Sequence, residues 1–260
     1  MIKSSWKLLT LPLLLFIAIP IIAIFLRTSL TDVIANLNQT QVVKAVNLSL
    51  LTSLITIVVT WIAGTPVAYL LAQPRFRFHR LVDTLIDLPT VLPPAVAGVA
   101  LLMAFGRRGL FGAWLEILDI QIPFTVSAVV MAQTFLAAPF YVKAAAIGFS
   151  AIDPELKQAA ALDGANRWQI FRHITMPLSW TALLSGSVMT WARALGEFGA
   201  TIIFAGNFPG RTQTMPLAIY VGFEIDMNVA LTLAIILISF SFLTLVIVKG
   251  FLHNRLDPDS

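Results

Sequence analysis

The 260-residue sequence contains no cysteine, and only 12% of its residues are Asp, Glu, Lys or Arg. Without cysteine the chain has no disulfide, no thiolate nucleophile and no cysteine-ligated metal. The three histidines, His79, His173 and His253, form no HExxH pattern, so the sequence predicts no metal site. GxSxG and GxxxxGK[ST] patterns are also absent, so we expect no catalytic residue and no nucleotide-binding loop in this chain.

The sequence is rich in apolar residues. They make up 58% of the sequence and give a mean hydropathy of +0.88, which is typical of an integral membrane protein. The formal net charge is +4. In membrane proteins an excess of basic residues usually reflects orientation in the membrane and not nucleic-acid binding. We therefore expect a membrane protein with no nucleic-acid partner.

Six apolar stretches are long enough to cross a hydrocarbon core of roughly 30 Å as helices. All but the fifth lack charged residues, and the third, which is the shortest, is a candidate for a partly re-entrant segment. No Pro/Ser-rich linker divides the chain, so we expect one all-α transmembrane domain over residues 1–260. The stretches are Leu8–Leu26, Ala45–Ala72, Leu88–Phe105, Ile122–Val142, Leu178–Ala205 and Met227–Val248.

Lys and Arg are distributed unevenly between the two sides of these spans. With the N-terminus inside, eleven lie in the cytoplasm and five outside, and Arg193 lies within a span. The positive-inside rule therefore predicts both termini in the cytoplasm. The cytoplasmic set is Lys3, Lys7, Arg75, Arg77, Arg80, Lys143, Lys157, Arg167, Arg172, Lys249 and Arg255, and the outside set is Arg27, Lys44, Arg107, Arg108 and Arg211.

The first apolar stretch has an alternative interpretation as a cleaved signal peptide, because Lys3 and Lys7 precede it. The stretch is longer than the apolar region of most signal peptides, and no small-x-small cleavage site follows it. We expect a retained first span.

Pro89, Pro93 and Pro94 interrupt the start of the third stretch. Proline lacks an amide proton and disfavours helix in the preceding residue, so regular helix breaks here. Broken backbone is not tolerated in lipid and must be buried in protein or line an aqueous cavity. The break is either a bend beside a transport pathway, lined by Pro93 and Pro94, or a kink that neighbouring helices accommodate.

The fifth stretch carries Arg193 and Glu197, four residues apart, which places them on one face of a continuous helix, where they can pair. Charges inside a span usually face the bundle interior and often mark a pathway. Gly196 and Gly199 add a surface suited to close helix packing. Arg193 either lies near a transported anion, held in place by Glu197, or forms a purely structural pair with it.

A polar stretch from Gln158 to Pro177 separates the fourth and fifth apolar stretches. Its alanines, Gly164 and scattered charges predict a short helix, a turn and a second helix. Small residues on a helix face let the backbone of another protein come close. We therefore expect segment 145–177, which is cytoplasmic by the charge count, to present a docking surface.

Residues 206–216 are rich in Gly, Pro and Asn and predict an outside loop that contacts an external partner or closes a gate. The loop leads to Leu217–Phe223, which is either a short surface helix or a re-entrant piece.

The polar segment resembles the EAA loop of binding-protein-dependent ABC importer permeases, EAA-x3-G-x9-I-x-L-P. Every spacing is kept, but Gln158 replaces the acidic residue and Met176 replaces leucine. In the family this loop forms the coupling helix that fits a groove on the ATPase subunit. Glu155, one turn earlier, is an alternative carboxylate for that contact. The corresponding residues here are Gln158, Ala159, Ala160, Gly164, Ile174 and Pro177.

A more specific resemblance is to the molybdate permease branch of the sulfate/molybdate group. The segments that carry it are Ala192–Thr201, Ala205–Tyr220, Leu88–Pro94 and Phe105–Gly109. The resemblance implies a type I ABC importer permease fold in the bacterial plasma (inner) membrane. It also implies a homodimer with two ATPase subunits, which bind ATP and Mg, and a periplasmic or extracellular substrate-binding protein. The implied cargo is molybdate, with sulfate, thiosulfate, tungstate and vanadate as alternatives.

Two functions from other classes remain open. An ATPase-independent secondary transporter or channel has no need of the EAA-like spacing. A membrane phosphotransferase is suggested by the element Asp163–Arg167, but the following helix lacks the further aspartates of a two-metal site.

Overall fold

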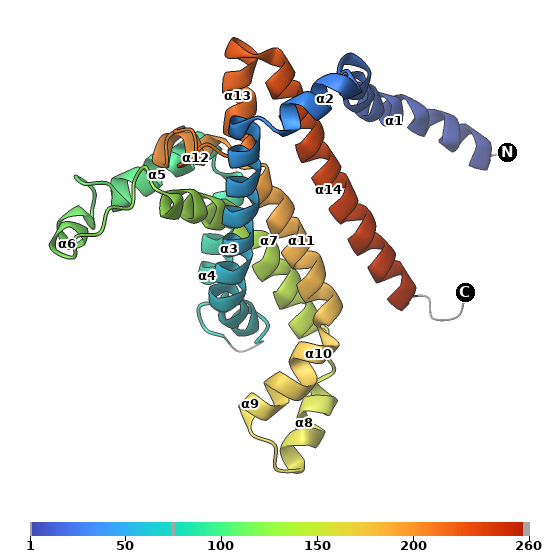
Figure 1. Ribbon diagram of the computed structural model, residues 1–260. Helices are drawn as coiled ribbons and strands as arrows, with labels where there is room; N and C mark the ends of the chain where they lie inside the picture. The colour runs from blue at the N-terminus through green and yellow to red at the C-terminus, as the bar shows by residue number, and fades with distance from the viewer. Residues whose placement is uncertain (1, 74–75, 257–260) are drawn as a thin grey trace.

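The structure is a computed structural model that describes residues 2–73 and 76–256 (Figure 1). The described residues are mostly helical and contain no strand. The helices are α1 (Ile2–Arg27), α2 (Leu30–Leu37), α3 (Thr40–Leu71), α4 (His79–Val91), α5 (Pro94–Phe105), α6 (Gly112–Ile117), α7 (Val126–Ser150), α8 (Pro154–Leu162), α9 (Arg167–Ile170), the π-helix η1 (Phe171–Thr175), α10 (Met176–Leu178), α11 (Trp180–Leu195), α12 (Gly199–Phe204), α13 (Met215–Ile225) and α14 (Met227–Leu256).

Four of the predicted spans are confirmed as long helices. The segments Leu9–Arg27, Thr40–Leu71, Val126–Ser150 and Met227–Val246 are long and apolar enough to cross a membrane. They correspond to the first, second, fourth and sixth predicted stretches, although the fourth helix starts later than Ile122 and runs on beyond Val142. The orientation predicted from Lys and Arg depends in part on Arg75, which lies outside the described residues.

The third and fifth predicted spans are not continuous helices. The third is divided into α4 and α5, and the chain bends by 116° between them, around Pro93. The fifth is divided between α10, α11 and α12, because α11 ends at Leu195 and α12 begins only at Gly199. The predicted interruption by proline is confirmed in the third stretch, whereas the predicted single helix over 178–205 is wrong. Glycines flank the second break and lower the cost of leaving helix there.

The core of the bundle is built by α3, α7 and α11, which lie side by side (Figure 1). Between helices in lipid there is little hydrophobic driving force, so small and hydrogen-bonding residues make the contacts. Thr56 on α3 donates to Gln133 on α7 at 3.1 Å, and Thr190 on α11 donates to the carbonyl of Ala137 on α7 at 3.1 Å. All four residues are buried.

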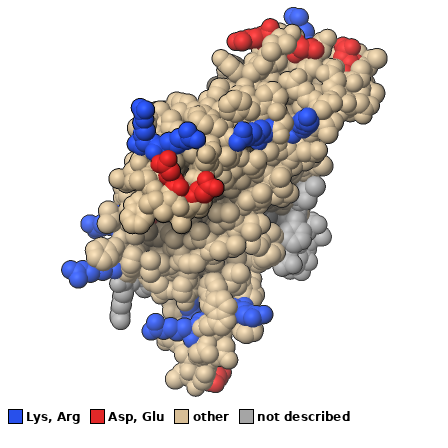
Figure 2. All heavy atoms as spheres, turned by 60° about the vertical axis from the view of Figure 1, so that its left-hand side comes forward, with Lys and Arg blue, Asp and Glu red and all other residues tan. Residues whose placement is uncertain are grey.

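The two ends of the bundle differ. The helices α8 and α9 form a projecting hairpin at one end, whereas α2 and α13 lie at the other (Figure 1). The segment Leu217–Phe223 belongs to α13, which packs against α14 so closely that a Cβ on Gly222 would lie 2.9 Å from Ala230 Cβ. Most of the face in Figure 2 is uncharged, and Lys and Arg flank the hairpin tip at the bottom of that view.

Gly186 allows α11 to approach α7, because a Cβ there would lie 2.8 Å from Ala144 Cβ and 3.1 Å from Tyr141 Cα. We predict that Gly186→Ala forces these helices apart and destabilises the fold by about 1–3 kcal/mol, as overpacking of a core does. Thermal unfolding in detergent measures the effect. Gly250→Ala on α14 is the matched control, since no atom lies within 4 Å of its Cβ position. Equal melting temperatures for the two variants would contradict the prediction.

Candidate substrate pathway and docking hairpin

The two helix breaks, which lie about a hundred residues apart in the sequence, pack against each other. A Cβ on Gly199 would lie 2.7 Å from Pro94 Cβ, and a Cβ on Gly98 would lie 2.8 Å from the Ala200 carbonyl oxygen. The first two turns of α5 therefore touch α12 with no room for a methyl group. The structure thus brings together two features that the sequence predicts separately, the proline break and the segment that carries Arg193 and Glu197.

The first break is made by Pro93 and Pro94, not by all three prolines. Leu92 and Pro93 have extended backbone, and Pro94 occupies the first turn of α5, where a missing amide proton costs nothing. The Pro93 carbonyl accepts the amide of Ala97, which starts the new helix. Pro89 lies buried within α4 and does not end it. Pro93 and Pro94 are exposed in the isolated chain.

The second break is organised by Glu197. One carboxylate oxygen, Oε2, accepts from Nη1 of Arg193 at 2.6 Å, and the other, Oε1, accepts from the amide of Ala200 at 2.8 Å. The predicted pairing is confirmed, but the residues do not share a helix face, because α11 ends before Glu197. The carboxylate instead caps the start of α12, where unpaired amides and the helix dipole favour negative charge.

Burial separates the roles that the two charged residues can play. Glu197 is 1% exposed and both of its oxygens are occupied, whereas the Arg193 side chain is 30% exposed. A guanidinium has five N–H donors, and the ion pair uses Nη1 alone among its nitrogens. Arg193 can therefore stay paired with Glu197 and still donate to a second anion.

The hairpin turn has a backbone geometry that favours glycine at position 164. Its φ is +90°, its amide donates to the Ala161 carbonyl at 3.1 Å, and the next amide, of Ala165, donates to the Ala160 carbonyl at 3.0 Å. These two bonds form a Schellman motif, in which a left-handed residue ends the helix and glycine carries no steric penalty. The geometry of this turn therefore explains why glycine occupies this position of the EAA pattern.

The second helix of the hairpin starts at a capping box. Asn166 Oδ1 accepts from the amide of Gln169 at 2.9 Å, and Gln169 Oε1 accepts from the amide of Asn166 at 2.8 Å. The predicted helix, turn and helix are thereby confirmed. The element Asp163–Arg167 forms this turn and the start of α9. Among the described residues there is no group of three or more His, Asp or Glu that could hold a metal.

The hairpin surface has nothing packed on it in the isolated chain. No residue of α8 is buried, and Leu162 and Trp168 are 89% and 64% exposed. A Cβ on Gly164 would meet no atom within 4 Å. Ala160 is half-buried, while the other members of the predicted docking set on this helix and turn are exposed: Glu155, Gln158, Ala159 and Gly164.

The last two residues of the predicted docking set lie at the root of the hairpin and not at its tip. Ile174, which is half-buried, belongs to η1, and Pro177 lies in α10. The structure therefore separates the EAA pattern into an exposed docking part and a part that joins the hairpin to the bundle.

An aromatic cluster that the sequence reading missed holds this root in place. The Phe171 ring contacts Tyr69 of α3 and Phe149 of α7, with centroids 5.0 and 5.9 Å apart, and stacks on Trp168 at 5.6 Å. Lys157 also donates to the Phe149 carbonyl at 3.2 Å, and burial lowers the pKa of this lysine. The spacing of Trp168 and Phe171, three residues apart, is the only sequence signal for this cluster.

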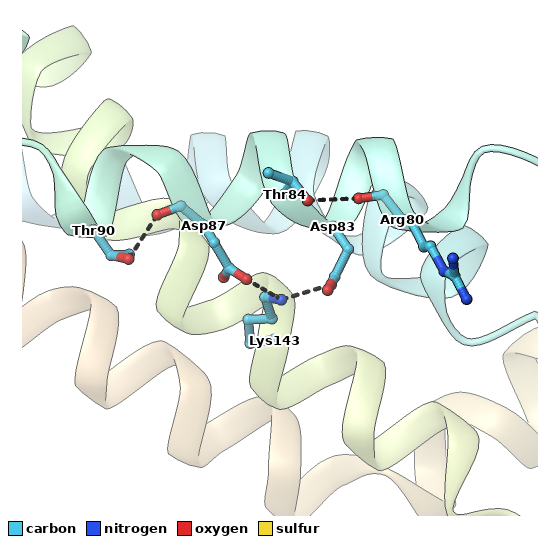
Figure 3. A network of polar contacts seen from close by, with 6 residues as sticks. All are labelled: Arg80, Asp83, Thr84, Asp87, Thr90 and Lys143. Carbon is cyan, nitrogen blue, oxygen red and sulfur yellow. Dashed lines mark hydrogen bonds and ion pairs between the residues drawn. The ribbon is translucent and has the colours of Figure 1, made fainter.

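The sequence reading also missed an ion cluster between α4 and α7. Lys143 Nζ lies 2.6 Å from Asp83 Oδ1 and 2.8 Å from Asp87 Oδ2 (Figure 3). The four-residue spacing of the two aspartates is the signal that places them on one helix face. Their lysine partner is far away in the sequence, so no local pattern identifies it.

Comparison with known proteins agrees with this architecture. Residues 64–259 match the family described as "Binding-protein-dependent transport system inner membrane component". The chain is 42% identical to a putative molybdenum transport permease, YvgM, of Bacillus subtilis (72% of this chain, 84% of the relative). It is 39% identical to the molybdenum permease ModB of Mycobacterium tuberculosis (86% and 85%), and 35% identical to the sulfate permease CysT of Escherichia coli (79% and 74%).

Solved structures show the same fold. A chain of a bacterial ABC transporter that imports alginate superposes with a TM-score of 0.73 at 17% identity, covering 100% of this chain and 98% of the other. A chain of the MetNI methionine transporter superposes with a TM-score of 0.63 at 19% identity, covering 82% and 94%. With the family match over most of its length, the chain belongs to the inner membrane components of binding-protein-dependent transport systems and is a permease subunit of an ABC importer.

Proposed function

We propose that this permease subunit carries molybdate across the bacterial inner membrane, driven by ATP hydrolysis on a partner subunit. The main support is sequence identity of about 40% to relatives named for molybdenum transport. Sulfate is the second candidate, because the sulfate permease CysT is 35% identical over a similar length. Thiosulfate, tungstate and vanadate are the remaining alternatives, and tungstate has the same charge and shape as molybdate.

The exposed hairpin of α8 and α9 is the proposed docking site for the ATPase subunit. Its free surface, with Ala159 and Gly164 exposed, matches the EAA pattern, and no nucleotide-binding loop occurs in this chain. ATP and Mg therefore belong to the partner. Under this proposal the hairpin end lies in the cytoplasm and the α13 end lies outside, where a substrate-binding protein delivers the anion. Both termini are proposed to be cytoplasmic, as the Lys and Arg count predicts.

A second copy of the chain is the proposed partner within the membrane. The Leu9–Arg27 window of α1 has no buried residue, although it is the most apolar of the long helices, and Figure 1 shows α1 extending away from the bundle. A homodimer supplies protein surface for this helix, and the anion crosses between the two copies. Pro93, Pro94, Arg193 and Glu197 are proposed to border that pathway.

The cargo is tested by ATPase activity of the reconstituted complex with its binding protein, titrated separately with molybdate, tungstate and sulfate. Molybdate is expected to stimulate hydrolysis at the lowest concentration. Stimulation by sulfate alone would mean that the cargo is sulfate and not molybdate. Uptake without ATP would contradict the ABC mechanism.

The docking role predicts a charge-specific effect at the turn. Gly164→Asp should lower ATP-driven uptake at least about tenfold, because an unpaired charge buried in a packed interface costs on the order of 1–3 kcal/mol or more. Gly164→Asn is the matched control, since both side chains tolerate a positive φ better than other residues do and only Asp adds charge. Uptake and co-purified ATPase are measured for both. If Gly164→Asp and Gly164→Asn transport equally, the turn does not lie in a close interface.

The pathway role predicts that Arg193→Gln lowers uptake at least about tenfold, because truncating one partner of a buried charge pair costs about 2–5 kcal/mol. The double variant Arg193→Gln with Glu197→Gln removes both charges and leaves no unpaired carboxylate. We expect it to remain inactive, since the anion has lost its donor. Restored uptake in the double variant would make the pair purely structural.

A further inference from the structure

The ion cluster of Lys143, Asp83 and Asp87 joins two helices that have different roles (Figure 3). Lys143 lies on α7 in the bundle core, and both aspartates lie on α4, which leads into the Pro93 break. The side chains of Lys143, Asp83 and Asp87 are 33%, 39% and 47% exposed, so each is partly buried. The lysine lies between two carboxylates, so both of its contacts are attractive, although the cluster keeps a net charge of −1.

The helix α4 has few other attachments to the bundle. Leu81, Leu85 and Leu88 are 58%, 56% and 49% exposed. Val82 and Ile86 are its partly buried apolar side chains that pack against the core cluster around Phe149. The polar contact through Lys143 is therefore one of a small number of contacts that fix α4 on the bundle, beside Val82, Ile86 and the buried Pro89.

The same core cluster reaches the hairpin. Phe171 and Met176, from the hairpin root, pack against it together with Val82 and Ile86 of α4. Beyond α4, the chain passes through Pro93 to Pro94, which touches Gly199 beside the Arg193–Glu197 pair. A continuous set of contacts thus runs from the hairpin root through α4 to the helix breaks.

We propose that Lys143 is a positioning residue that clamps α4 to α7, so that movement of the hairpin is transmitted to the helix breaks and not lost as independent movement of α4. This role rests on the proposed function, because it assigns ATP-driven movement to the hairpin. Lys143 contacts no substrate in this role. It determines how much transport each hydrolysed ATP produces.

The test is the number of anions transported per ATP hydrolysed by the reconstituted complex. Lys143→Met should lower this ratio at least about fivefold, the size of a typical coupling between sites. A variant that only reduced the folded fraction would lower uptake and hydrolysis together and leave the ratio unchanged. Melting temperature and co-purified ATPase establish that the complex is assembled.

Two further variants make the test specific. The exchange Lys143→Asp with Asp87→Lys keeps the same three charges and should restore the ratio to within about twofold of wild type. Thr84→Val is the matched control, because the Thr84 hydroxyl bonds only to the Arg80 carbonyl of its own helix, at 2.8 Å. An unchanged ratio in Lys143→Met, or a ratio lowered equally by Thr84→Val, would overturn the clamp.

A measurement without substrate separates the clamp from the choice of cargo. Amide hydrogen exchange in residues 79–91 should be faster in Lys143→Met than in wild type or Thr84→Val, because local opening of α4 is no longer held back by the ion cluster. Unchanged exchange overturns the clamp whatever the cargo is. Absence of molybdate uptake by wild type, with faster exchange in Lys143→Met, would contradict the proposed cargo and support the clamp.

Discussion

Two interrupted helices inside an apolar layer must satisfy their backbone groups with protein, and this constraint organises the rest of the fold. The chain meets it by packing one break on the other, with Pro94 against Gly199 and α5 against α12. Glu197 then satisfies the amide of Ala200 and pairs with Arg193 in the same place. The only paired charges of the fifth span therefore lie where the backbone is already irregular, which is where membrane transporters tend to place substrate groups.

The hairpin of α8 and α9, where the ATPase subunit is proposed to dock, is also well held. The hairpin is held together by its own local bonds, the Schellman turn at Gly164 and the capping box at Asn166. Its root is fixed by Phe171 among aromatic rings from α3 and α7. A rigid element with a well-packed root transmits movement, whereas a flexible loop would absorb it. This is the physical property that an ATP-driven coupling element requires.

Features set by local sequence were predicted well, and those set by distant contacts were not. The long apolar helices, the proline break and the helical hairpin follow from composition, proline chemistry and turn residues. The break at Gly196–Phe198 was missed because apolar composition alone suggests a continuous helix. The packing of Pro94 on Gly199 and the partner of Asp83 and Asp87 depend on the tertiary fold, since no local period relates residues so far apart.

ATPase docking on the hairpin is tested most directly by site-specific photo-crosslinking from Leu162, which is 89% exposed on α8. In the assembled complex, a photoreactive residue at this position is predicted to crosslink to the ATPase subunit. The same residue placed at Ile225, 80% exposed on α13 at the opposite end, should not do so. Crosslinks from Leu162 to the substrate-binding protein, or from Ile225 to the ATPase, would contradict both the docking site and the orientation in the membrane.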